Sequence, residues 1–226
     1  MRPRPATSPP AATDPVGVAL GRSRATARTG APSDLLVVGL GNPGQQYAGT
    51  RHNVGVEVVE LLAARHGERL RPSKDARALV AEIRPDGHRV ALAFPSTYMN
   101  DSGEAVAPLC RRFGIDDPMH LVVVHDELDF PPGRLKVKIG GGLAGHNGLR
   151  SITAHLHTQD YVRIRIGVGK PPGGSERGVD HVLAAPSKRD RELIGVCVVE
   201  AADAVEMILT DGAEAAMGRY NTRQEP

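Results

Sequence analysis

Polar residues gather where predicted strands end or predicted helices begin. Asn42 follows the first apolar run of the 226-residue chain, His52 precedes a helical pattern, and Asp126 follows a second apolar run. A histidine close to an aspartate can act as an oriented general base, and asparagine offers neutral donors and acceptors that suit amide and ester groups. Comparable positions are held by Tyr98, Met99, Asn100, His146 and Asn147. The set favours chemistry on an ester or an amide.

Water is the predicted attacking group in such a reaction. The chain has no G-x-S-x-G nucleophile elbow, and its two cysteines, Cys110 and Cys197, form no C-x-x-C pair. A disulfide framework or a structural zinc site is therefore not expected. Both cysteines are predicted to be small buried hydrophobes in a reducing cytoplasm.

Each candidate also has a structural explanation. Asn42 can be a turn residue of Asn-Pro-Gly, Asn147 can cap its helix, and His52 can be an exposed loop histidine. Asp126 can cap or bridge at a strand end, and His125 can be the working histidine instead of His52. Open α/β sheets bind ligands at the carboxyl ends of their strands. Convergence of the whole set at that edge is therefore what the functional interpretation requires.

The elements that position these residues are predicted from apolar periodicity. Predicted strands span residues 35–40, 76–83, 89–94, 121–125, 134–139 and 161–168. Predicted helices begin at Asn53, Ser102, His146 and Ser187 and end near Gly67, Gly114, His157 and Leu209. Interleaved strands and helices predict an α/β fold, a single domain with a twisted mixed β-sheet flanked by helices on both faces.

A glycine motif suggests a competing function. Residues 39–44 satisfy G-x-G-x-x-G after a strand, which is the pattern of a dinucleotide-binding turn. The following helix, however, is delayed to about Asn53, and the nearest acids, Glu57 and Glu60, lie within that helix instead of ending a second strand. A nucleotide-dependent oxidoreductase is therefore the weaker hypothesis.

Charge is distributed unevenly along the chain. Residues 1–32 hold five arginines and one acid, and residues 1–33 are predicted to form a disordered tail, followed by one domain over 34–226. The tail is typical of either an organellar transit peptide or an uncleaved or misannotated extension. Residues 134–170 hold seven basic residues and one acid, which is either a phosphate-binding footprint or an ordinary solvated face. No apolar run approaches the ~20 residues that span a bilayer, so a soluble protein is expected.

Five motifs follow one another in a fixed order. They cover residues 38–53 with Asn42, Tyr47 and His52, residues 95–103 with Tyr98-Met99-Asn100, residues 125–133 with Asp126, residues 140–149 with His146-Asn147, and residues 163–169. Together they resemble the bacterial-type peptidyl-tRNA hydrolases from about residue 34 to about residue 220. The chain departs from the family at Leu143-Ala144, where His-Gly is common, and the N-terminal tail has no counterpart.

The resemblance implies an enzyme that cuts the ester between a peptide and its tRNA, without a metal or an organic cofactor. It implies that His52 deprotonates water, that Asp126 orients His52, and that Asn42 helps to select substrates with a blocked amino group. The remaining implied contacts are Asn100 and Asn147 to the peptide backbone, Tyr47, Tyr98, Met99 and His146 along the cleft, and Lys138 and Arg165 to the tRNA 5′ phosphate.

The implied partner is tRNA, with no membrane contact, and the implied state is a monomer in the cytoplasm. An alternative stays open, because some plant relatives of this fold resemble RNA-splicing adaptors that do not hydrolyse their ligand.

Overall fold

The computed structural model describes residues 31–171 and 178–222, so nearly all of the predicted tail lies outside the described residues. Seven strands form one sheet in the order β2-β3-β4-β1-β5-β7-β6. Their bounds are β1 Leu35–Gly39, β2 Arg71–Pro72, β3 Ala78–Ile83, β4 Val90–Pro95, β5 Leu121–Glu127, β6 Leu135–Ile139 and β7 Val162–Gly167. Strands β4, β1, β5 and β7 run parallel, whereas β2, β3 and β6 extend the sheet in antiparallel fashion. The predicted mixed sheet is confirmed.

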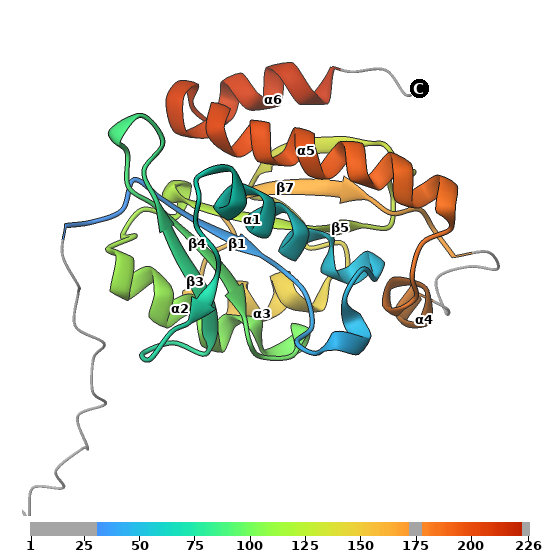
Figure 1. Cartoon of the computed structure of the whole chain (residues 1–226), viewed down its shortest axis with the longest axis horizontal. Coiled ribbons are helices and arrows are strands. Elements are labelled where there is room, and N and C mark those ends of the chain that lie inside the picture. The colour runs from blue at the N-terminus through green and yellow to red at the C-terminus, as the bar shows by residue number, and fades with distance from the viewer. Residues whose placement is uncertain (1–30, 172–177, 223–226) are drawn as a thin grey trace, which may run out of the picture.

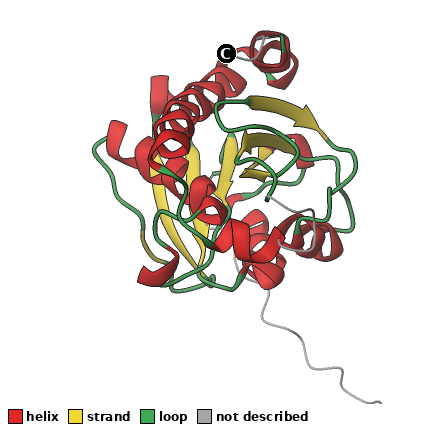
Figure 2. Ribbon diagram, turned by 90° about the vertical axis from the view of Figure 1, so that its right-hand side faces the viewer, coloured by secondary structure: helices red, strands yellow, loops and turns green. Residues whose placement is uncertain are grey.

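Helices cover both faces of the sheet (Figures 1 and 2). They are α1 Val54–Arg65, α2 Ser102–Phe113, α3 Asn147–Leu156, α4 Gly178–Leu183, α5 Lys188–Asp211 and α6 Ala213–Asn221. Figure 1 shows α1, α5 and α6 on one side of the sheet and α2 and α3 on the other. No helix of the described residues is both long and apolar enough to pass through a bilayer.

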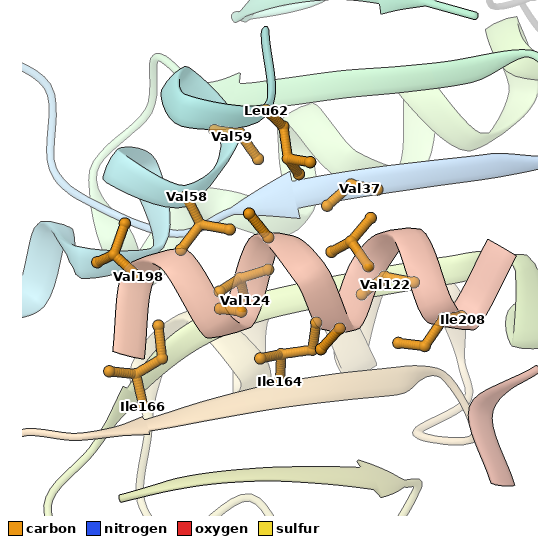
Figure 3. Close-up of a cluster of buried hydrophobic side chains, with 14 of the residues drawn as sticks. Val37, Val58, Val59, Leu62, Val122, Val124, Ile164, Ile166, Val198 and Ile208 are labelled. Carbon is orange, nitrogen blue, oxygen red and sulfur yellow. The ribbon is translucent and has the colours of Figure 1, made fainter. Parts of the chain in front are cut away.

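Two apolar clusters hold these layers together, because side chains of a strand point alternately to its two faces. Val37 of β1 and Val124 of β5 pack with α1 and α5 on one face, as Figure 3 shows. The neighbouring Val38 and Val123 pack with α2 and α3 on the other face. The central strands are therefore covered on both sides, which explains their uninterrupted apolar sequences.

Two glycines let the start of α1 lie directly against the sheet. A Cβ on Gly55 would lie 2.3 Å from the carbonyl oxygen of Val124 and 2.6 Å from the amide nitrogen of Leu40. A Cβ on Gly39 would lie 2.1 Å from the carbonyl oxygen of Gly55. Only glycine fits at either position, and the first glycine of the G-x-G-x-x-G pattern thus serves helix–strand packing.

Several elements differ from the sequence predictions. The short strand β2 and the helices α4 and α6 were not predicted, and β5 continues two residues beyond His125. Asn53 does precede α1, but its side chain makes no cap hydrogen bond to the helix. It bonds instead to the backbone of Asn42. Ser102 is the first residue of α2 and follows the N-cap residue Asp101.

We predict that Gly55→Ala destabilises the protein by up to about 3 kcal/mol, because overpacking of a dense core typically costs about 1–3 kcal/mol. The substitution should also reduce activity, because it pushes the start of α1 away from β5. Gly195→Ala is the matched control, since nothing lies within 4 Å of its added Cβ in α5, and alanine is favoured there by roughly 1 kcal/mol. Urea unfolding curves measure both changes; equal stability of the two variants would contradict the packing argument.

Candidate active site

His52 and Asp126 meet at the carboxyl edge of the parallel strands. His52 lies in the short 3-10 turn Arg51–Asn53 that leads into α1, and Asp126 lies near the end of β5. The Nδ1 atom of His52 is 2.8 Å from Oδ1 of Asp126. The two residues are 74 positions apart in the sequence, so the packing of α1 against β5 creates this contact.

His146 makes a second hydrogen bond to the same carboxylate oxygen. Its Nε2 atom is 3.1 Å from Oδ1 of Asp126. Its Nδ1 atom caps α3 by accepting hydrogen bonds from the amides of Gly148 and Leu149, at 3.1 and 3.4 Å. An acceptor Nδ1 carries no proton, so the hydrogen-bond network assigns the proton of His146 to Nε2, which donates to Asp126.

The same reasoning assigns the proton of His52. Asp126 is ionised and accepts hydrogen bonds only, so Nδ1 of His52 must be the donor. In the neutral imidazole, Nε2 of His52 is then left with its lone pair. This is the protonation state that a general base needs.

The charge state of Asp126 follows from its surroundings. Its side chain is only 3% exposed, and burial by itself would raise its pKa. The charges of His52 and His146 and their hydrogen bonds act in the opposite direction and hold the pKa of Asp126 well below its usual range. A carboxylate that is ionised at neutral pH therefore faces two imidazoles.

His125 has a different role from its neighbour Asp126. It is 1% exposed, does not line the cleft, and its Nδ1 lies 2.7 Å from the backbone oxygen of Asp126. Burial, followed by the charge of His146, holds the pKa of His125 well below its ordinary value. His125 is therefore buried and held neutral away from the cleft, which favours His52 over His125 as the working histidine.

Asn42 is fixed by three hydrogen bonds. Its backbone N–H donates to Oδ1 of Asn53, and its backbone carbonyl oxygen accepts from Nδ2 of Asn53, both at 2.9 Å. Its own Oδ1 accepts a hydrogen bond from the amide of Met99 at 2.8 Å. Since Oδ1 is occupied, the side-chain NH₂ group is the part of Asn42 that is left to donate into the cleft.

A cleft of about 470 Å³ contains most of the predicted site. Its lining includes eight predicted residues, namely Asn42, His52, Tyr98, Met99, Asn100, Asp126, His146 and Asn147. The lining residues that were not predicted are Glu127, Leu128, Ala144, Gly145 and the α4 residues Gly178, Val179, Val182 and Leu183. Tyr47 lies in the 3-10 turn Gln45–Tyr47 and is not part of the lining.

The two predicted phosphate ligands lie outside the cleft on β6 and β7. Lys138 of β6 is opposite Arg163 of β7, and its side chain is half-buried. Arg165 donates to one carboxylate oxygen of Glu127 from Nε at 3.1 Å and from Nη2 at 2.8 Å. Because Glu127 also lines the cleft, Arg165 is linked to the site through an ion pair.

Arg163 supports the glycine loop, residues 140–145. Its side chain is 2% exposed, and its guanidinium donates to the carbonyl oxygens of Gly140, Gly141 and Gly142. Three carbonyls of the loop that leads to His146 are thereby fixed. Alternation predicted the strand and the shared face of Arg163 and Arg165, but a sequence does not reveal that one arginine turns inward.

One group among the described residues has the donor atoms for a metal ion. The ligand atoms of His52, Asp126 and His146 lie within 4.8 Å of one another. The imidazole nitrogens nearest to Asp126 already donate hydrogen bonds to its carboxylate. An ion could bind there only by displacing both of those protons.

A histidine–aspartate pair and amide side chains in a cleft at the carboxyl edge of an α/β sheet can support hydrolysis by an activated water. The family model described as Peptidyl-tRNA hydrolase matches residues 36–226. The chain belongs to the peptidyl-tRNA hydrolase family.

Individual relatives agree with this assignment. Peptidyl-tRNA hydrolase of Cutibacterium acnes is 49% identical over 197 residues, which cover 83% of this chain and 98% of the relative. The protein of the same name from Nocardia farcinica is 50% identical and covers 82% of this chain and 95% of the relative. The crystal structure of peptidyl-tRNA hydrolase from Acinetobacter baumannii superposes with a TM-score of 0.79 at 38% identity, over 87% of this chain and 99% of that one.

The burial of His125 predicts an acid-dependent loss of stability. Its pKa in the folded protein lies below the ordinary value of 6.5, so below about pH 6.5 the unfolded chain binds the additional proton and stability falls as pH falls. His125→Asn keeps a donor for the Asp126 carbonyl but does not titrate. We expect this variant to lose less stability than the unsubstituted protein between pH 7.5 and 5.5, measured by urea unfolding.

The contribution of Asp126 belongs to a lower pH window and serves as an internal reference. Its pKa is depressed in the folded state, so this stabilisation is present above about pH 4 and is lost as pH falls further. Both proteins should share that second loss. Identical slopes between pH 7.5 and 5.5 would show that His125 is not held neutral.

Proposed function

We propose that this chain hydrolyses the ester bond of peptidyl-tRNA, releasing free tRNA and peptide, with His52 as the general base. The observation that carries the assignment of His52 is its 2.8 Å hydrogen bond from Nδ1 to Asp126. That bond leaves Nε2 as the basic atom at a cleft of about 470 Å³. Family membership and the named relatives support the substrate.

The reaction has two proton transfers through His52. Nε2 takes a proton from water while the water oxygen bonds to the ester carbonyl carbon. The bond from that carbon to the ribose oxygen then breaks, and the imidazolium returns its proton to the departing oxygen. Asp126 stays ionised throughout and stabilises the imidazolium that exists between the two steps.

The amide side chains supply complementary contacts for the peptide backbone. Oδ1 of Asn147 accepts a hydrogen bond from Arg150 at 2.6 Å, so its NH₂ group, like that of Asn42, is a donor for a substrate carbonyl. Nδ2 of Asn100 donates to Asp101 at 3.0 Å, so its Oδ1 is an acceptor for a substrate N–H. Such a site favours a blocked amino group, because a substrate with a free ammonium lacks the amide carbonyl and leaves donors of the site, among them that of the buried Asn42, unpaired.

The two competing functions find less support. Relatives of this chain are named as hydrolases, and the residues proposed to carry out hydrolysis line one cleft, so the splicing-adaptor alternative is not supported. The oxidoreductase hypothesis rested on the glycine motif, and Gly39 of that motif is accounted for by its contact with Gly55.

Other properties of the enzyme are extensions of this proposal. We infer that the catalytic domain spans residues 34–226 and acts as a cytoplasmic monomer on the acceptor end of tRNA. The roles of Tyr98, Met99 and His146 along the cleft belong to the same proposal. Tyr47 stays a predicted cleft residue, although it is not part of the cleft lining.

His52→Ala should reduce turnover of N-acetyl-phenylalanyl-tRNA by at least ~10²-fold, since a positioned general base contributes ~10²–10⁴-fold. Binding of tRNA should be retained, because the predicted phosphate ligands lie on β6 and β7, away from the turn that carries His52. His88→Ala is the control, since His88 precedes β4 at the opposite end of the parallel strands. Near-normal turnover of the His52 variant would remove the proposed base.

Lys138→Ala should raise KM for peptidyl-tRNA more than it lowers turnover, and should reduce the salt dependence of binding by about one counterion. Arg165→Ala should do the same and also lower the melting temperature, because it leaves the carboxylate of Glu127, which is 4% exposed, without that partner. Lys74→Ala, on the opposite edge of the sheet between β2 and β3, is the control. Equal KM values for all three variants would contradict phosphate binding by β6 and β7.

A further inference from the structure

The turn that carries His52 contacts three different parts of the cleft through three consecutive residues. His52 binds Asp126 of β5, and Asn53 binds the backbone of Asn42. Arg51 turns the other way, toward α4. Its side chain is 9% exposed, so a cation is buried one residue away from the base.

The guanidinium of Arg51 binds the C-terminal end of α4. Nη1 donates to the carbonyl oxygens of His181, Ala184 and Ala185, at 3.4, 3.2 and 3.0 Å. The backbone amide of Arg51 also donates to the oxygen of Ala184, at 3.3 Å, and Nη2 lies 3.5 Å from Asp190 at the start of α5. One side chain therefore joins the catalytic turn, α4 and α5, which Figure 1 shows beside one another.

Helix α4 depends on contacts of this kind. It has six residues, and helices this short are not stable without tertiary partners. The last carbonyls of any helix lack partners within the helix, and a cation at that end is also favoured by the helix dipole. Arg51 supplies both the donors and the charge.

The face of α4 toward the cleft is apolar. Val179, Val182 and Leu183 line the cleft together with Leu128, and the asparagines and histidines of the site line the same cleft. Val179 is 65% exposed and so leaves apolar surface for a ligand to cover. Figure 1 places α4 next to the turn of residues 45–53, drawn in blue, which carries the base.

We propose that Arg51 is a positioning residue for substrate specificity. It fixes α4 so that Leu128, Val179, Val182 and Leu183 form an apolar subsite for the side chain of the peptide's last residue. This inference rests on the proposed function, because it assumes that the acyl group of the ester occupies the cleft. Apolar C-terminal residues then gain affinity from the subsite, whereas glycine gains none.

The fork of the arginine matters for this role. Lysine keeps the positive charge but offers a single ammonium, whereas the two arms of the guanidinium divide the contacts, with Nη1 on the carbonyl oxygens and Nη2 facing Asp190. Arg51→Lys should therefore hold α4 only in part, and Arg51→Met should not hold it. Arg51 does not hydrogen-bond to Asp126 or to His52 among the contacts of the described residues, so chemistry at His52 should persist in both variants.

The test compares one tRNA that carries either N-acetyl-phenylalanine or N-acetyl-glycine. For the unsubstituted protein we expect a higher kcat/KM with phenylalanine, and for Arg51→Met a loss of about tenfold for phenylalanine alone, mostly in KM, as expected for weakened apolar contacts. For Arg51→Lys, kcat/KM with phenylalanine should lie between the values of the unsubstituted protein and of Arg51→Met. Arg191→Met is the control, because Arg191 is also an arginine in an ion pair, with Glu57 of α1, and within the described residues its side chain makes no hydrogen bond to α4 or to the cleft lining.

Val179→Ser provides a second route that does not depend on the folding of an Arg51 variant. Its exposed side chain can be changed without disturbing the core, and it should also reduce the ratio of the two kcat/KM values. The proposed subsite is contradicted if Arg51→Met lowers kcat/KM equally for both substrates. It is also contradicted if neither Arg51→Met nor Val179→Ser changes the ratio of the two kcat/KM values. If the unsubstituted protein hydrolyses neither substrate, the proposed function itself has failed.

Discussion

Two imidazoles that donate to one buried carboxylate oxygen are the constraint on which this site depends. The side chain of Asp126 is 3% exposed, and an isolated carboxylate is costly to bury. The protons on Nδ1 of His52 and Nε2 of His146 offset that cost and keep Asp126 ionised. The ionised carboxylate in turn fixes the tautomer of His52. The basicity of Nε2 is thus a consequence of how Asp126 is accommodated in the fold.

The backbone makes this arrangement possible. Gly39 and Gly55 let α1 approach β1 and β5 so closely that a Cβ on Gly55 would lie 2.3 Å from the Val124 oxygen. That approach brings the turn before α1 to the end of β5. The turn then holds the cleft together: Asn53 fixes Asn42, and Arg51 fixes the end of α4. Residues with no chemical role therefore set the distances among those that have one.

The sequence predicted the central sheet well, because β1 and β5 are buried on both faces and read as uninterrupted apolar runs. It did not predict α4 or α6, since a six-residue helix has too few residues for a periodic pattern and depends on tertiary contacts. The convergence of His52, Asp126 and His146 was predicted only from their positions at element ends and from the family resemblance. Asn53 was predicted to cap α1, which is the usual role of an asparagine before a helix, but it binds the backbone of Asn42. The role of Arg163 was missed because an arginine on a strand is usually exposed, whereas this one binds the glycine loop. Only tertiary contacts reveal either role.

The tautomer of His52 is the most direct measure of this account, and nitrogen-resolved NMR of the imidazole at neutral pH can determine it. We expect the proton on Nδ1, an unprotonated Nε2, and loss of this preference in Asp126→Asn. His146 should show the opposite tautomer, with its proton on Nε2. A proton on Nε2 of His52 in the unsubstituted protein would contradict the account, because that atom could then not accept a proton from water.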